Sequence, residues 1–167
     1  MNVVLIGMPG AGKSTVGVLA AKALGMDFTD TDLVIQTERG KTLAEIIAER
    51  GLSGFSDIED DTLARLERDN CVIATGGSAV FCEKGMAHLA EGGRTIYLRV
   101  EPNDLRARLG NIRTRGVVMR EGETLDELIA ERAPYYERYA DFTVDEHGDI
   151  EDTVAEVTEI ARSFLGR

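Results

Sequence analysis

A glycine-rich segment near the N-terminus has the residue types and the spacing needed to hold phosphate. Residues 7–14 read Gly-Met-Pro-Gly-Ala-Gly-Lys-Ser and match the pattern G-x-x-x-x-G-K-[ST] at every fixed position. The glycines let the backbone curl so that successive N–H groups converge on phosphate oxygens, and the helix that follows adds the positive end of its dipole. Lys13 should then reach the β- and γ-phosphates of ATP, while the Ser14 hydroxyl ligates Mg²⁺.

The context of this segment supports the assignment, because an apolar run precedes it and a helical pattern follows it. The alternative is a glycine-rich turn that binds nothing. Packing of such a turn would not require a lysine and a serine after the last glycine, which favours the phosphate-binding interpretation. The Thr15 hydroxyl would either contact the α-phosphate or only cap the helix. The residues predicted to bind ATP here are Gly10, Ala11, Gly12, Lys13, Ser14 and Thr15.

Two carboxylates follow the second predicted strand, at Asp30 and Asp32. In a parallel sheet, ligands bind beyond the carboxyl ends of the strands, so both side chains should lie beside the phosphate loop. Carboxylate oxygens suit a magnesium shell and also suit a general base. The alternative is that one of them caps the helix that follows, and a single aspartate could serve in both ways.

Short apolar runs alternate with helical patterns along the whole chain, which is typical of an α/β fold with a parallel sheet. Pro134 is expected to end the helix before it. The charged segment 110–122 lacks a clear hydrophobic periodicity and is predicted to be a mobile lid. Five strands are predicted at 2–6, 27–30, 71–74, 95–100 and 142–144, with helices at 14–24, 33–38, 43–50, 57–69, 83–90, 103–109, 125–133 and 150–165.

Composition excludes several classes of protein. The chain has 167 residues, which favours one domain over 1–167, and a formal charge of −11, which disfavours non-specific nucleic-acid binding. No apolar run is long enough to span a bilayer and the N-terminus lacks the features of a signal peptide, so we expect a cytoplasmic protein without membrane contact. Two cysteines, Cys71 and Cys82, are too few for a disulfide framework. We also expect a monomer.

Nothing matches the guanine-reading motif N-K-x-D, and a small phosphate-loop domain with a charged lid suits phosphoryl transfer to a small acceptor. Four motifs follow one another along the chain. They are Gly12-Lys13-Ser14-Thr15-Val16-Gly17, Asp30-Thr31-Asp32, Thr75-Gly76-Gly77-Ser78 and Glu131-Arg132-Ala133-Pro134-Tyr135-Tyr136. In this order they resemble the motifs of the shikimate kinases, and the resemblance covers nearly the whole chain.

The resemblance implies a three-layer P-loop NTPase fold, a five-stranded parallel sheet flanked by helices, a substrate-binding region near 32–60, and the use of ATP and Mg²⁺. It gives Asp30 to the metal shell and makes Asp32 the partner and base of the attacking hydroxyl. Arg115 in the lid would reach the transferred phosphoryl group, and Arg108 would stack on adenine; for both, the alternative is a solvated charge. The acceptor would be bound by Asp32, Glu59, Gly76, Gly77 and Arg132, of which Arg132 would grip a carboxylate or else pair with a nearby glutamate.

Three positions depart from the family pattern. Ser56 stands where the family has a second carboxylate-binding arginine, in the run Phe55-Ser56-Asp57-Ile58-Glu59. Ser78 replaces a third glycine and would narrow the approach of a ring or add a hydroxyl contact, and Gly116-Val117-Val118 follows the lid arginine in place of Pro and two leucines. Shikimate is the acceptor that the family implies. The alternatives are another small acceptor, such as homoserine or gluconate, and a nucleotide-binding regulator without catalysis.

Overall fold

Five parallel strands form one sheet in the order β2-β3-β1-β4-β5. The computed structural model describes residues 1–109, 117–146 and 148–166. The prediction of a five-stranded parallel α/β sheet is therefore confirmed. The strands are β1 (Asn2–Ile6), β2 (Asp27–Asp30), β3 (Cys71–Ala74), β4 (Gly93–Val100) and β5 (Phe142–Glu146).

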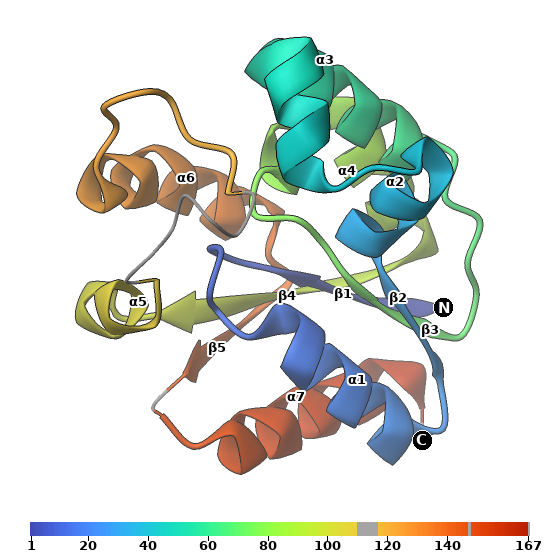
Figure 1. Ribbon diagram of the computed structural model, residues 1–167. Coiled ribbons are helices and arrows are strands. Elements are labelled where there is room, and N and C mark those ends of the chain that lie inside the picture. The colour runs from blue at the N-terminus through green and yellow to red at the C-terminus, as the bar shows by residue number, and fades with distance from the viewer. Residues whose placement is uncertain (110–116, 147, 167) are drawn as a thin grey trace.

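Helices cover both faces of the sheet and make the three layers that the resemblance implies. In Figure 1, α1 and α7 lie on one face, and α3, α4 and α6 lie on the other. None of the helices in the described part of the chain is long and apolar enough to cross a membrane. The helices are α1 (Lys13–Leu24), α2 (Thr31–Arg39), α3 (Leu43–Ala64), α4 (Glu83–Gly92), α5 (Pro102–Arg108), α6 (Leu125–Tyr139) and α7 (Ile150–Leu165), with a short 3₁₀ turn at Ala79–Phe81.

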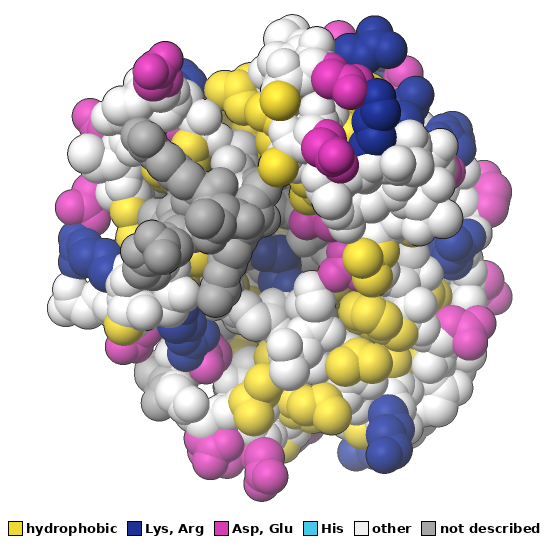
Figure 2. Space-filling model, in the orientation of Figure 1, with side chains coloured by type: hydrophobic (Ala, Val, Ile, Leu, Met, Phe, Trp, Pro, Cys, Tyr) yellow, Lys and Arg dark blue, Asp and Glu magenta, His cyan; other side chains and the backbone are white. Residues whose placement is uncertain are grey.

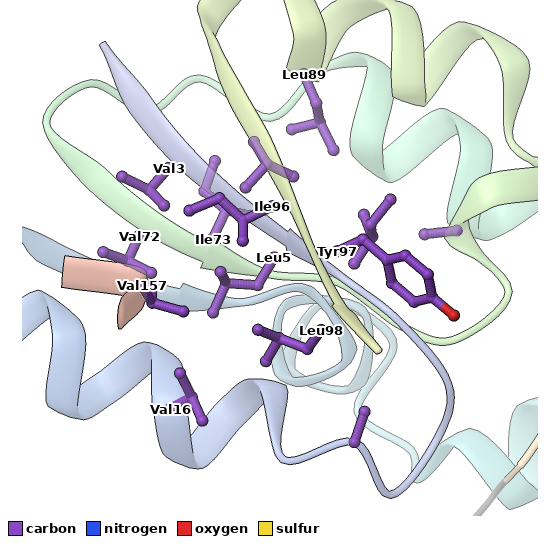
Figure 3. Packing of buried hydrophobic residues seen from close by; sticks show 14 of the residues in the cluster. Val3, Leu5, Val16, Val72, Ile73, Leu89, Ile96, Tyr97, Leu98 and Val157 are labelled. Carbon is purple, nitrogen blue, oxygen red and sulfur yellow. The ribbon is translucent and has the colours of Figure 1, made fainter. Parts of the chain in front are cut away.

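The core lies on both sides of the central strands. All five residues of β1 are buried, as expected for a strand covered on both faces. Leu5 and Leu98 lie toward Val16 of α1, whereas Tyr97 points to the opposite face (Figure 3). This packing fixes the carboxyl ends of β1, β2 and β3, and the functional residues begin where these strands end.

The largest differences from the predicted helices lie in two regions of the chain. The helix predicted to end before Pro134 continues through it to Tyr139. Proline removes one backbone hydrogen bond, but Tyr136 is fully buried and Tyr139 packs against the core, so tertiary contacts offset that loss. The two helices predicted at 43–50 and 57–69 meet at Gly51, which has a non-helical backbone (φ 70°), and the second one ends at Ala64 rather than at residue 69.

Candidate active site

One cavity of about 280 Å³ opens where β1, β2 and β3 end. Figure 2 shows this face hollowed near its centre, with basic side-chain atoms inside the hollow. The phosphate loop, the start of α2, the turn after β3 and α6 all contribute to its walls. The lining residues are Pro9, Gly10, Gly12, Lys13, Ser14, Thr15, Asp32, Leu43, Phe55, Thr75, Gly76, Gly77, Ser78, Leu109, Val117, Val118 and Arg132.

The phosphate loop has the curled backbone that its sequence predicts. Gly10 and Gly12 adopt positive φ angles of 81° and 80°, a region that favours glycine. The Lys13 ammonium group donates to the carbonyl oxygens of Gly7 at 2.8 Å and Met8 at 2.9 Å. Burial lowers the pKa of Lys13 to about 8, while the nearby Asp32 carboxylate opposes that shift. An ammonium group has three N–H donors, so these two bonds leave one for a phosphate oxygen.

Asp30 caps α2, which is one of the two roles weighed for it, and the second role of its carboxylate, as a metal ligand, stays a prediction. Its Oδ1 atom caps α2 by accepting hydrogen bonds from the backbone N–H groups of Asp32 at 3.0 Å and Leu33 at 3.4 Å. Its Oδ2 atom accepts a hydrogen bond from the Ser14 hydroxyl at 2.6 Å. A hydroxyl and a carboxylate this close form a pair of hard oxygen ligands, so the residues present fit a magnesium ion.

Asp32 reaches the cavity from the first turn of α2. Burial, together with the neighbouring Asp30 carboxylate, raises the pKa of this carboxyl group to about 6, while Lys13 opposes both effects. A carboxylate with a pKa near 6 is still mostly ionised at neutral pH, yet it is more basic than a solvated aspartate. This is the property required of a general base.

The turn after β3 requires glycine for reasons of space. A Cβ atom at Gly76 would lie 2.6 Å from Oε1 of Glu59 and 2.7 Å from Oδ1 of Asp32. A Cβ atom at Gly77 would lie 2.6 Å from Cδ of Pro9 and 3.1 Å from Nη1 of Arg132. The glycines therefore let three segments that are distant in the sequence converge on one cavity.

Glu59 lies directly behind this turn rather than in the cavity wall. Its side chain is fully buried, and its Oε2 atom accepts a hydrogen bond from the Ser78 hydroxyl at 2.6 Å. Burial raises the pKa of Glu59 to about 7, although the Ser78 bond opposes that shift. The hydroxyl that Ser78 adds to the turn is thus directed at Glu59. The predicted contact between Glu59 and an acceptor stays a prediction.

Arg132 is buried on α6, with 2% of its surface exposed. Its Nη2 atom donates to the carbonyl oxygen of Val118, and its Nε and Nη1 atoms have no hydrogen-bond partner among the described residues. Glu131, one of the two glutamates weighed as its partner, pairs with Arg120 instead. The second, Glu127, accepts hydrogen bonds from Thr124 at the start of α6. Arg132 therefore keeps buried N–H donors that a carboxylate could accept in charge-assisted hydrogen bonds.

The remaining predicted residues lie at the margins of the cavity or outside the described part of the chain. Arg108 forms an ion pair with the buried Glu146, and its stacking on adenine stays a prediction. Arg115 and most of the predicted lid lie outside the described residues. Ser56 faces a neighbouring cavity of about 290 Å³, which shares Arg132 and Val118 with the first cavity.

Two buried hydroxyl groups that hold the glycine turn were not singled out by sequence reasoning. The Thr31 hydroxyl accepts a hydrogen bond from the backbone N–H of Gly76 at 3.2 Å. The Tyr136 hydroxyl donates to the carbonyl oxygen of Gly77 at 2.6 Å. Both residues stand inside motifs that the sequence displays, beside Asp32 and Arg132. Their position next to functional residues was the available signal.

A phosphate loop, a basic carboxylate and a buried arginine around one small cavity define a P-loop kinase that acts on small molecules. The family model described as shikimate kinase matches residues 9–162. The chain is 37% identical over 167 residues to a shikimate kinase of Moorella thermoacetica, covering 98% of this chain and 96% of the relative. It is 39% identical over 158 residues to one of Thermodesulfovibrio yellowstonii, covering 93% and 91%. The chain belongs to the shikimate kinase family.

Solved structures agree with this assignment. A shikimate kinase from Acinetobacter baumannii in complex with shikimate superposes with a TM-score of 0.87 at 29% identity, covering 99% of this chain and 93% of that one. A gluconokinase from Sinorhizobium meliloti, with a TM-score of 0.50 at 16% identity and coverage of 99% and 95%, shares the fold alone. The predicted resemblance, the fold class and the activity of a small-molecule kinase are confirmed.

Proposed function

We propose that this chain transfers the γ-phosphate of ATP to a hydroxyl group of shikimate. The observation that carries the proposal is that Lys13, Asp32 and Arg132 line one cavity of about 280 Å³. Together they supply a cation for phosphate, a base for a hydroxyl and a fork for a carboxylate. A small hydroxy acid has the two groups that Asp32 and Arg132 recognise.

The nucleotide side of the reaction depends on residues at the ends of β1 and β2. Lys13 would neutralise charge on the β- and γ-phosphates, and the backbone N–H groups of residues 10–15 would hold their oxygens. Ser14 and Asp30 would hold Mg²⁺, whose contribution when bound is to neutralise the phosphate charge. The bond between Ser14 and Asp30 at 2.6 Å supports this assignment.

The acceptor side depends on Asp32 and Arg132. Asp32 would remove the proton from the acceptor hydroxyl as the hydroxyl oxygen bonds to the γ-phosphorus, and the bond to the bridging oxygen of ADP would break. Arg132 would hold the carboxylate so that the hydroxyl points along the line of attack, which lowers the entropic barrier. Arg115 would stabilise the charge that spreads over the transferred group.

The test is ADP release, measured by a coupled assay, with shikimate, homoserine and gluconate supplied separately. We expect shikimate to be phosphorylated with the highest kcat/KM, and we expect ADP release without an acceptor to be far slower. A higher kcat/KM for homoserine or gluconate would refute shikimate as the acceptor. ADP release that no acceptor accelerates would refute the kinase reaction itself.

A further inference from the structure

Tyr136 is the fully buried residue that connects α6 to the glycine turn. It lies one helical turn after Arg132, so both side chains project from the same face of the helix. Its hydroxyl group donates a hydrogen bond to the carbonyl oxygen of Gly77 at 2.6 Å. Its ring stacks on Tyr97 of β4, with centroids 5.1 Å apart and planes inclined by 23°. The ring is thus anchored in the core while the hydroxyl group reaches the glycine turn.

Gly77 lines the cavity between the phosphate loop and Arg132. A Cβ atom placed on Gly77 would lie 2.6 Å from Cδ of Pro9 in the phosphate loop. The same atom would lie 3.1 Å from Nη1 of the Arg132 guanidinium. A small shift of Gly77 would therefore alter the gap between the phosphate loop and Arg132. That gap would set how far an acceptor held by Arg132 lies from the γ-phosphate that its hydroxyl group attacks.

The hydroxyl group of Tyr136 suits the task of fixing this gap. Burial raises the pKa of its phenol well above the usual range, so the group stays protonated and donates. Without this donor the buried carbonyl oxygen of Gly77 would lack a hydrogen bond, so we expect the glycine turn to shift until the oxygen meets another donor.

We propose that Tyr136 is a positioning residue for the acceptor: through its bond to the Gly77 carbonyl, it holds the glycine turn at the distance from Arg132 that productive acceptor binding requires. The residue touches neither reactant and acts through Gly77. The inference rests on the proposed kinase function only for the identity of the acceptor. The contact itself, and its effect on the turn, do not depend on that identity.

The test compares Tyr136→Phe with Tyr135→Phe. The first variant keeps the ring that stacks on Tyr97 and removes only the hydroxyl group. The second removes a hydroxyl from the adjacent residue, which is 38% exposed and packs edge-to-face on Phe81. Because the turn can recover only part of the lost hydrogen bond by moving, we expect the KM for shikimate to rise about 5- to 20-fold in Tyr136→Phe. The KM for ATP should change less than about twofold, and Tyr135→Phe should match wild type.

A second measurement reports on the turn without any acceptor. Hydrogen exchange of a peptide covering residues 74–80 should be faster in Tyr136→Phe than in wild type, with no change in Tyr135→Phe, under conditions where all three proteins are folded. A merely structural role would lower the unfolding midpoint and the fraction of active enzyme but leave the acceptor KM unchanged. That result, or unchanged exchange in the turn, would overturn the proposal. If wild type does not use shikimate, the proposed function fails, while the exchange experiment still decides the role of Tyr136.

Discussion

Arginine introduced at position 56 would test how the acceptor carboxylate is held. Ser56 lies on α3 and lines the cavity of about 290 Å³ beside Arg132. An arginine side chain at this position can extend into that cavity and bring a second guanidinium toward the carboxylate that Arg132 is proposed to bind. The substitution would restore the residue type that the family pattern has at this position.

The size of the effect follows from the hydrogen bonds that Arg132 already makes. One of its nitrogens donates to Val118, and Nε and Nη1 have no partner among the described residues, so a carboxylate can already be held by Arg132 alone. A second charge-assisted hydrogen bond is worth about 1.5–3 kcal/mol, or roughly 10- to 150-fold in affinity. Repulsion between two neighbouring guanidinium groups opposes this gain, so we expect the lower part of that range.

The assay is kcat/KM for shikimate in wild type, in Ser56→Arg and in Ser53→Arg. Ser53 lines the same cavity from the same helix, one turn earlier, so its variant adds the same charge in a matched place. We expect Ser56→Arg to lower the KM for shikimate and Ser53→Arg to have a smaller effect. An acceptor with an ammonium group, such as homoserine, should be used less well by Ser56→Arg because of repulsion. A micromolar KM for shikimate in wild type that Ser56→Arg does not improve would show that Arg132 suffices, and the reasoning would be wrong.

Three further substitutions examine the charged groups of the site. Lys13→Ala should lower kcat by about 10²- to 10³-fold without changing the circular dichroism spectrum, because the lysine stabilises transition-state charge; unchanged turnover would contradict the phosphate-loop assignment. Asp32→Asn should lower kcat by about 10²- to 10⁴-fold while ATP affinity is retained, and a collapse of ATP affinity would place Asp32 in the metal shell instead. In the wild-type protein, kcat/KM should rise as the pH increases through about 6, because Asp32 ionises there. Burial raises the pKa of Glu59 from the usual 4.5 to about 7 in the folded chain, so the folded state favours the protonated form. The free energy of unfolding should therefore fall by up to about 3 kcal/mol as the pH rises from 4.5 to 7. Urea unfolding of Glu59→Gln should lack that decrease, and an equal slope in both proteins would show that Glu59 does not titrate in this range.

Sequence reasoning predicted those parts of the candidate site whose residues are neighbours in the chain. The phosphate loop is one run of eight residues, so its glycines, lysine and serine reveal their function together. Asp30 is similar, because the residues that it caps lie two and three positions further on. The parallel sheet was predictable for a related reason, since β1, β3 and β4 each carry their own apolar run.

The contacts that sequence reasoning did not predict join residues that are distant in the chain. The Ser78 hydroxyl bonds to a carboxylate 19 positions away, and the Tyr136 hydroxyl bonds to a carbonyl 59 positions away. No local pattern encodes such pairs, because they depend on how α3 and α6 pack against the turn after β3. The helix that continues through Pro134 has the same cause, since the burial of Tyr136 outweighs a local signal to stop.

The burial of Arg132 links acceptor binding to the stability of the fold. A guanidinium group with two nitrogens unpartnered among the described residues is costly in a place where only 2% of its surface is exposed. The same burial makes a bond to a carboxylate stronger than it would be in water, because less solvent competes for the donors. An acceptor that supplies this carboxylate therefore satisfies donors that the chain itself leaves open, and it stabilises the folded state by mass action. Arg132 also donates to the carbonyl oxygen of Val118, in the segment that leads into α6, so an acceptor bound as proposed would share one guanidinium group with that segment.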